Sequence, residues 1–85
     1  MRMKVRMYCT HSCGYCRMAL QFLEKKGAQV DKLYLDEDSA LRKEMISLSG
    51  RTSVPQIFIG DQHIGGYTDL VELDMDGELD PLLAA

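Results

Sequence analysis

The chain has 85 residues with a net charge of −3 at neutral pH, and 46% of it is hydrophobic and 27% charged. This length and composition predict one domain over residues 1–85, exclude a disordered chain, and argue against nucleic acid as a partner because no basic cluster offsets the acidic balance. No apolar run has the length of a membrane span or the form of a signal peptide, so we expect a cytoplasmic protein with no membrane partner.

The first half of the chain predicts two strands and two helices in alternation. Apolar and basic residues alternate over 3–8, which is typical of a half-buried strand. Apolar residues then recur at helical spacing over 13–26, up to a glycine that can end a helix. A second strand is expected over 30–35, and a second helix over 41–49, before the next glycine.

The second half predicts a hairpin and one more helix. Residues 56–59 form an apolar run, Gly60-Asp61 is a turn signal, and 62–64 returns as the partner strand. A third helix is expected over 68–74, and a last helical turn over 80–83.

The predicted order is β-α-β-α-β-β-α, which defines an α/β fold. The first two strands are joined through a helix and should be parallel, whereas the last two should be antiparallel. We therefore expect a four-stranded mixed sheet flanked by helices.

Cys13 and Cys16 lie three positions apart at the predicted start of the first helix. Residues at this spacing have Cβ atoms about 5–6 Å apart, so their sulfur atoms are within reach of each other. The helix start supplies free N–H groups and a partial positive charge, which favour a thiolate at Cys13. Cys16 should be more buried and less ionised. The pair predicts redox chemistry; an inert core pair and half of a zinc site are the alternatives.

Two further segments carry candidate binding groups. The Val54–Pro55 bond is of the kind in which the cis form is accessible, at about 0.5–1 kcal/mol, and a cis bond would turn the Val54 backbone outward. The alternative is an ordinary proline at a strand start. Thr68-Asp69 follows two glycines at a predicted helix start and presents amides and a carboxylate, either as a binding site or as a plain helix cap.

Together these motifs resemble the glutaredoxin family, in particular the short bacterial dithiol type within the thioredoxin-fold superfamily. The likeness covers nearly the whole chain. The matching segments are Val5-Arg6-Met7-Tyr8, Cys13-Gly14-Tyr15-Cys16, residues 50–59 with the proline, His63-Ile64-Gly65-Gly66, Thr68-Asp69-Leu70 and Asp80-Pro81-Leu82-Leu83.

The resemblance implies a thioredoxin-like fold and a glutathione-dependent thiol–disulfide oxidoreductase. Its substrates would be disulfide-containing or glutathionylated proteins, reduced by a dithiol or monothiol mechanism. Cys13 would be the nucleophile and Cys16 the resolving thiol, with glutathione as cosubstrate and no metal required. We expect a monomer.

The resemblance also assigns a glutathione groove. Val54 would pair through its backbone with the cysteine of glutathione, as an added strand does. Thr68 and Asp69 would hold the γ-glutamyl end. Arg42 would bind the glycine carboxylate or be simply solvated, and Tyr15 would form a wall of the groove or pack on its own helix. The full expected set is Tyr15, Arg42, Ser53, Val54, Pro55, Gly66, Thr68 and Asp69.

Three positions depart from the family pattern. Gly14 replaces the usual proline and frees an N–H group. Glutaredoxins with altered motifs sometimes hold a [2Fe–2S] cluster between two subunits, through the first cysteine and glutathione. A dimeric cluster carrier that uses Cys13 is therefore an alternative function. Thr10 stands where many relatives have lysine, so glutathione affinity would be weaker or would rely more on Arg42. Cys9 stands where the family tends to have a hydroxyl residue.

Cys9 opens two other interpretations. With Cys13 and Cys16 it resembles the [4Fe–4S] spacing of radical S-adenosylmethionine enzymes, but their barrel needs at least about 200 residues. We expect Cys9 to be a small residue at a strand end, or a site of regulatory oxidation. A thioredoxin-like reductase recharged by a flavoprotein is a further alternative, against which the Thr68-Asp69 segment argues.

Overall fold

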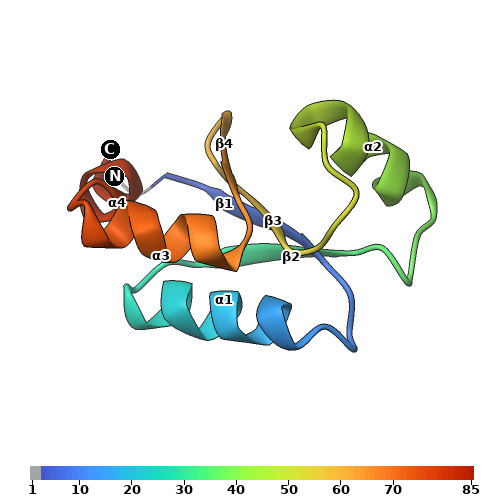
Figure 1. The fold of residues 1–85 in the computed structure, drawn as a ribbon, viewed down its shortest axis with the longest axis horizontal. Helices are drawn as coiled ribbons and strands as arrows, with labels where there is room; N and C mark the ends of the chain where they lie inside the picture. The colour runs from blue at the N-terminus through green and yellow to red at the C-terminus, as the bar shows by residue number, and fades with distance from the viewer. Residues whose placement is uncertain (1–2) are drawn as a thin grey trace.

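The computed structural model describes residues 3–85 and builds them around one four-stranded sheet in the order β2-β1-β3-β4 (Figure 1). The strands are β1 (Val5–Cys9), β2 (Val30–Tyr34), β3 (Gln56–Ile59) and β4 (Gln62–Gly65). β1 pairs in parallel with β2 and antiparallel with β3, and β3 pairs antiparallel with β4. The predicted mixed sheet is confirmed.

Helices lie on both faces of this sheet. They are α1 (Gly14–Lys25), α2 (Ala40–Ser49), α3 (Tyr67–Met75) and α4 (Leu79–Ala84). Figure 1 shows α1 below the strands and α2 above them, and α3 contacts α1. None of the helices in residues 3–85 is both long and apolar enough to span a membrane.

The core is divided between the two faces. The larger cluster joins β1 and β3 to α1, α3 and α4, and the smaller one consists of Tyr8, Leu35, Met45 and Phe58 beneath α2. The predicted strand is confirmed, with Val5 and Met7 buried, but Tyr8 is also fully buried in this second cluster, so the strand is more buried than expected. β1 is an interior strand with helices over both faces, which removes the solvent-facing side that an alternating pattern predicts.

The helix ends explain where the functional segments lie. Cys13 is the N-cap of α1, and Gly50 ends α2 in the left-handed region at φ 71°. α3 begins at Tyr67, one residue earlier than predicted, because Gly66 is its N-cap. One groove is lined by residues from the start of α1, the start of α3 and the loop before β3.

Candidate active site

Cys13 is held at the start of α1 by its own helix. Its backbone is extended (φ −84°, ψ 114°), as an N-cap requires, and its sulfur accepts a hydrogen bond from the N–H of Cys16 at 3.2 Å. The side chain is half-buried, and it is a free thiol. A hydrogen-bond donor from the helix start, with partial positive charge, stabilises a thiolate more than a thiol.

Cys16 lies in the first turn of α1 and differs from Cys13 in its surroundings. Only 3% of the residue is exposed. Burial raises the pKa of its thiol to about 12, and the hydrogen bond with Cys13 adds to this effect. The structure therefore places a solvent-reaching sulfur and a protonated, buried sulfur next to each other.

The loop before β3 lies against Cys13. The Val54–Pro55 bond is cis, so the alternative of an ordinary trans proline at a strand start was wrong. The Cys13 thiol donates to the carbonyl of Val54, with sulfur and oxygen 3.8 Å apart. The backbone of Val54 is thus beside the thiols, as the sequence predicted.

A groove of about 230 Å³ runs from this loop to the start of α3. Its lining residues are Tyr15, Arg51, Ser53, Val54, Pro55, Gln56, Gly66, Tyr67, Thr68 and Asp69. The structure therefore brings together all of the predicted glutathione residues except Arg42. Arg42 is outside this set, and its guanidinium donates to the carbonyl of Thr52 at 3.4 Å.

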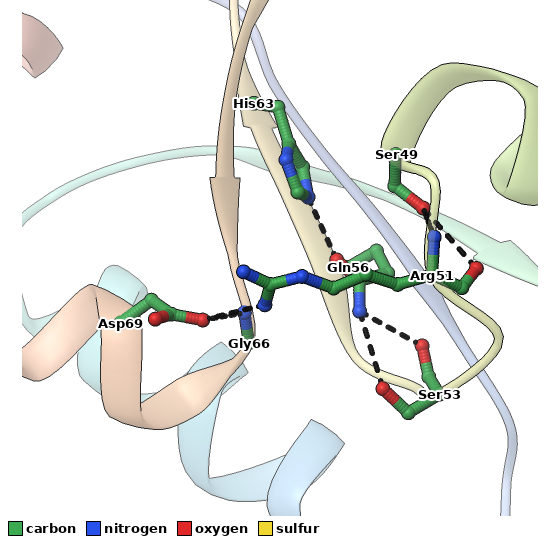
Figure 2. A network of polar contacts seen from close by, with 7 residues as sticks. All are labelled: Ser49, Arg51, Ser53, Gln56, His63, Gly66 and Asp69. Carbon is green, nitrogen blue, oxygen red and sulfur yellow. Dashed lines mark hydrogen bonds and ion pairs between the residues drawn. The ribbon is translucent and has the colours of Figure 1, made fainter.

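Asp69 carries the negative charge of the groove. Its Oδ2 accepts from the N–H of Gly66 and from Arg51, each at 2.9 Å (Figure 2). The Gly66 N–H, and then Arg51, lower the pKa of this carboxyl, so Asp69 is ionised at neutral pH. Gly65 has φ 116°, and a Cβ at this position would collide with the Asp69 carboxylate. The Gly-Gly turn is therefore what permits this contact.

Arg51 is the charged groove residue that the sequence did not point to. Its backbone N–H is bound by Ser49 Oγ at 3.0 Å, which fixes the chain directly after α2, and its side chain reaches across the groove to Asp69. About half of the Arg51 side chain is exposed. The sequence did offer one signal for this role, a basic residue four positions before Pro55, but the family resemblance pointed to Arg42.

Gln56 supports the loop from beneath. It is the buried polar residue of the core, 1% exposed. Its Nε2 donates to the carbonyl of Ser53 at 3.0 Å, and its Oε1 accepts from His63 Nε2 at 2.7 Å (Figure 2). Burial, and then the charge of Arg51, lower the pKa of His63, so the imidazole is neutral at neutral pH. A neutral hydrogen-bonded pair therefore sets the position of the chain just before Val54.

Aromatic rings form the wall between α1 and α3. Tyr15 is 62% exposed, and its ring centroid is 6.1 Å from that of Tyr67. The ring of Phe22 meets Tyr67 edge-on at 6.4 Å. Tyr15 thus lines the groove rather than packing only on its own helix.

His11 lies on the other side of the α1 start. Its ring stacks on Tyr34 with 3.7 Å between centroids, and its nitrogens lie 2.8 Å from Asp36 Oδ2 and 3.2 Å from Glu37 Oε2. The His11 side chain is held by these contacts and is not among the residues that line the groove. It therefore does not replace the lysine that is absent at Thr10.

The comparison with known proteins agrees with this geometry. The Glutaredoxin family model matches residues 5–64. Glutaredoxin 3 of Escherichia coli K12 is 52% identical over 79 residues, which cover 93% of this chain and 95% of that protein.

Solved structures give the same result. The crystal structure of a buckwheat glutaredoxin–glutathione complex has a TM-score of 0.88 and 30% identity, and the match covers 95% of this chain and 76% of the other. The solution structure of glutaredoxin from Brucella melitensis has a TM-score of 0.83 and 41% identity, covering 96% and 89%.

Proposed function

The chain belongs to the glutaredoxin family, and we propose that Cys13 and Cys16 perform its chemistry, with the adjoining groove as the glutathione site. The chain is a glutathione-dependent thiol–disulfide oxidoreductase with a thioredoxin-like fold. The observation that carries the residue assignment is the half-buried Cys13 sulfur, bound by the N–H of Cys16 and facing the carbonyl of Val54.

The reaction begins at Cys13. Its thiolate attacks one sulfur of a protein disulfide or of a protein–glutathione disulfide; the old S–S bond breaks and the second sulfur leaves as a thiolate. The mixed disulfide is then resolved by glutathione or by Cys16, which must first lose its proton. Two molecules of glutathione reduce the Cys13–Cys16 disulfide and leave as oxidised glutathione.

The groove has groups that match each part of glutathione. The N–H and C=O of Val54 would pair with the backbone of its cysteine, in the manner of an added strand. The γ-glutamyl end carries a carboxylate and an ammonium, which suit the free amides at the start of α3 and the ionised Asp69. Arg51, rather than Arg42, would supply positive charge for a carboxylate of glutathione, because Arg51 lines the groove.

Trapping of the mixed disulfide tests these roles. The Cys16→Ser variant is exposed to oxidised glutathione, and the modified cysteine is located by mass spectrometry; we expect one glutathione on Cys13. The matched control is the Cys13→Ser, Cys16→Ser variant, which keeps Cys9 and should gain none. An adduct only on Cys9, or no adduct, would contradict the assignment.

The iron–sulfur alternative finds limited support in the ligands. Residues 3–85 contain no group of three or more His, Cys, Asp or Glu side chains that could hold a metal ion. Cys13 is the one thiol of the three that is not buried. A [2Fe–2S] cluster would therefore need ligands from glutathione and a second subunit. Anaerobic reconstitution with iron, sulfide and glutathione tests this: a coloured dimer supports it and a colourless monomer contradicts it.

The remaining expectations concern partners and location. We propose a cytoplasmic monomer that acts on disulfide-containing or glutathionylated proteins. The observations that support these substrates are the partly exposed Cys13 and an open groove with both charge signs. Activity with a thioredoxin reductase but not with glutathione would contradict this proposal.

A further inference from the structure

Cys9 is a third thiol that the reaction above does not use. It is the last residue of β1 and 1% exposed. Residues along a strand alternate between faces, so Cys9 shares with Val5 and Met7 the face that α1 covers. Cys9 and Cys16 belong to the same buried cluster.

A second cavity connects these two sulfur-bearing residues with the surface. It has a volume of about 230 Å³ and lies on the opposite side of the α1 start from the groove. Cys9 and Cys16 both line it, together with Thr10, His11, Arg17 and Tyr34 among others. Cys13 is not among the lining residues and faces Val54 instead.

The three thiols are close enough for charge on one to affect the pKa of another. Besides burial and the hydrogen bond to Cys13, charge on Cys13 and charge on Cys9 each raise the pKa of Cys16. Burial raises the pKa of Cys9 to about 11, less than that of Cys16; a hydrogen bond with the backbone of Leu33 lowers it, and charge on Asp36 and on Cys13 raises it. Cys9 and Cys16 are therefore two buried thiols that line one cavity, next to a Cys13 that faces the carbonyl of Val54.

We propose that Cys9 is a second resolving thiol, which attacks Cys16 in the Cys13–Cys16 disulfide and forms a Cys9–Cys16 disulfide. The thiolate of Cys9 attacks the sulfur of Cys16, the bond from Cys16 to Cys13 breaks, and Cys13 leaves as a thiolate. One proton is released from Cys9, one S–S bond replaces another, and no external oxidant or reductant is consumed. This step rests on the proposed function, because that reaction supplies the starting disulfide.

The direction of attack follows from the three environments. A good leaving thiolate is one that is stabilised, and Cys13 has the N–H of Cys16 at 3.2 Å for this purpose. A buried thiol ionises rarely, so the step should be slower than the first exchange at Cys13. Its product is an oxidised molecule in which Cys13 is free to react again. Such a molecule acts as a monothiol enzyme until glutathione reduces the Cys9–Cys16 bond.

The Cys13→Ser variant isolates the new bond. After treatment with diamide, we expect the protein to lose two hydrogen atoms in mass and both remaining reactive thiols, measured with N-ethylmaleimide in mildly acidic guanidinium. The matched control is the Cys9→Ser, Cys13→Ser variant, which should keep its thiol. Retention of both thiols in Cys13→Ser, or a doubled mass from pairing between molecules, would overturn the proposal.

The wild-type chain tests whether the relay occurs when Cys13 is present. After oxidation and acid quenching, one cysteine is available for N-ethylmaleimide, and fragmentation of the tryptic peptide 7–17 locates it. Label on Cys13 supports the relay, and label confined to Cys9 overturns it. The Cys9→Ser variant separates this result from the proposed function: it should still lose both of its thiols by forming the Cys13–Cys16 bond, whether or not the relay exists.

Discussion

The two sides of the α1 start use charged residues in opposite ways. On the groove side, Arg51 and Asp69 pair at 2.9 Å but line an open groove, so their charges are available to a ligand. On the other side, His11 lies between Asp36 and Glu37 and stacks on Tyr34, so its contacts fix the loop that precedes Cys13. The same helix start thus has one side, the groove side, whose charged residues line an open groove, and another, the closed side, whose charged residues contact His11.

Among the variants that compare the two sides, loss of Cys13 should cause the largest loss of activity. Cys13→Ser removes the nucleophile, and we expect the reduction of a peptide–glutathione disulfide to fall by on the order of 10³ or more. The matched control is Ser12→Ala, at the exposed neighbouring position, which should stay within about twofold. Substantial activity in Cys13→Ser would show that the reacting sulfur belongs to the closed side.

Gln56→Leu tests the support beneath the groove. Leucine fills a similar volume but leaves the carbonyl of Ser53 and the Nε2 of His63 without their partner. A buried polar group without a partner costs about 1–3 kcal/mol, so we expect the free energy of unfolding to fall by about 2 kcal/mol in urea denaturation. Restoration of stability by a second substitution, His63→Leu, would confirm that the lost pair is the cause; no loss in Gln56→Leu would contradict it.

Asp69→Asn tests the charge that the groove offers to a ligand. Asparagine can still accept from the N–H of Gly66, whereas the charge that would meet the ammonium of glutathione is removed. A hydrogen bond to a charged group contributes about 1.5–3 kcal/mol, so we expect KM for glutathione to rise by about tenfold, with kcat less affected. The matched control on the closed side is Asp36→Asn, for which KM should change by less than about twofold. Equal effects of the two variants would remove the distinction between the sides.

The sequence predicted local features well, because their causes are local. The thiol at a helix start, the cis bond at Val54–Pro55 and the Gly65-Gly66 turn each follow from the chemistry of a few neighbouring residues. The second covered face of β1 was missed, since the pattern of one strand does not reveal what packs across the sheet.

Contacts between distant segments were harder to predict. Arg51 and Asp69 are 18 residues apart, and they meet because the loop after α2 and the start of α3 reach the same end of the sheet. Arg42 was expected in the groove on family resemblance, but α2 directs it to the carbonyl of Thr52. Gln56 and His63 form a hydrogen bond across the β3–β4 hairpin. The register of this hairpin is irregular between Ile57 and Phe58, and the turn residues alone do not predict that irregularity.

Acid unfolding should give the smallest effect and the finest separation of the two sides. The pKa of Asp69 is lowered first by the N–H of Gly66, and that of Asp36 first by the hydrogen bond with His11. A carboxyl with a lowered pKa contributes stability above its ordinary pKa near 4, and that contribution is lost as pH falls through the lowered value. We therefore expect the free energy of unfolding to decrease from about pH 5 to about pH 2, and less steeply in Asp69→Asn and in Asp36→Asn.

Salt then distinguishes the two carboxyls, because their main partners differ. The first partner of Asp69 is a neutral amide, whose hydrogen bond is little affected by ions. The first partner of Asp36 is the imidazole of His11, 2.8 Å away in an exposed ion pair, and salt screens exposed ion pairs strongly. The free energy of unfolding is measured against pH by urea denaturation at low and at high salt. The decrease in its pH dependence caused by Asp69→Asn should be the same at both salt concentrations. The decrease caused by Asp36→Asn should be smaller at high salt. If high salt reduces both effects equally, the pKa of Asp69 is lowered mainly by Arg51 and not by the Gly66 amide. The carboxylates on the two sides would then be stabilised in the same way, by exposed charges.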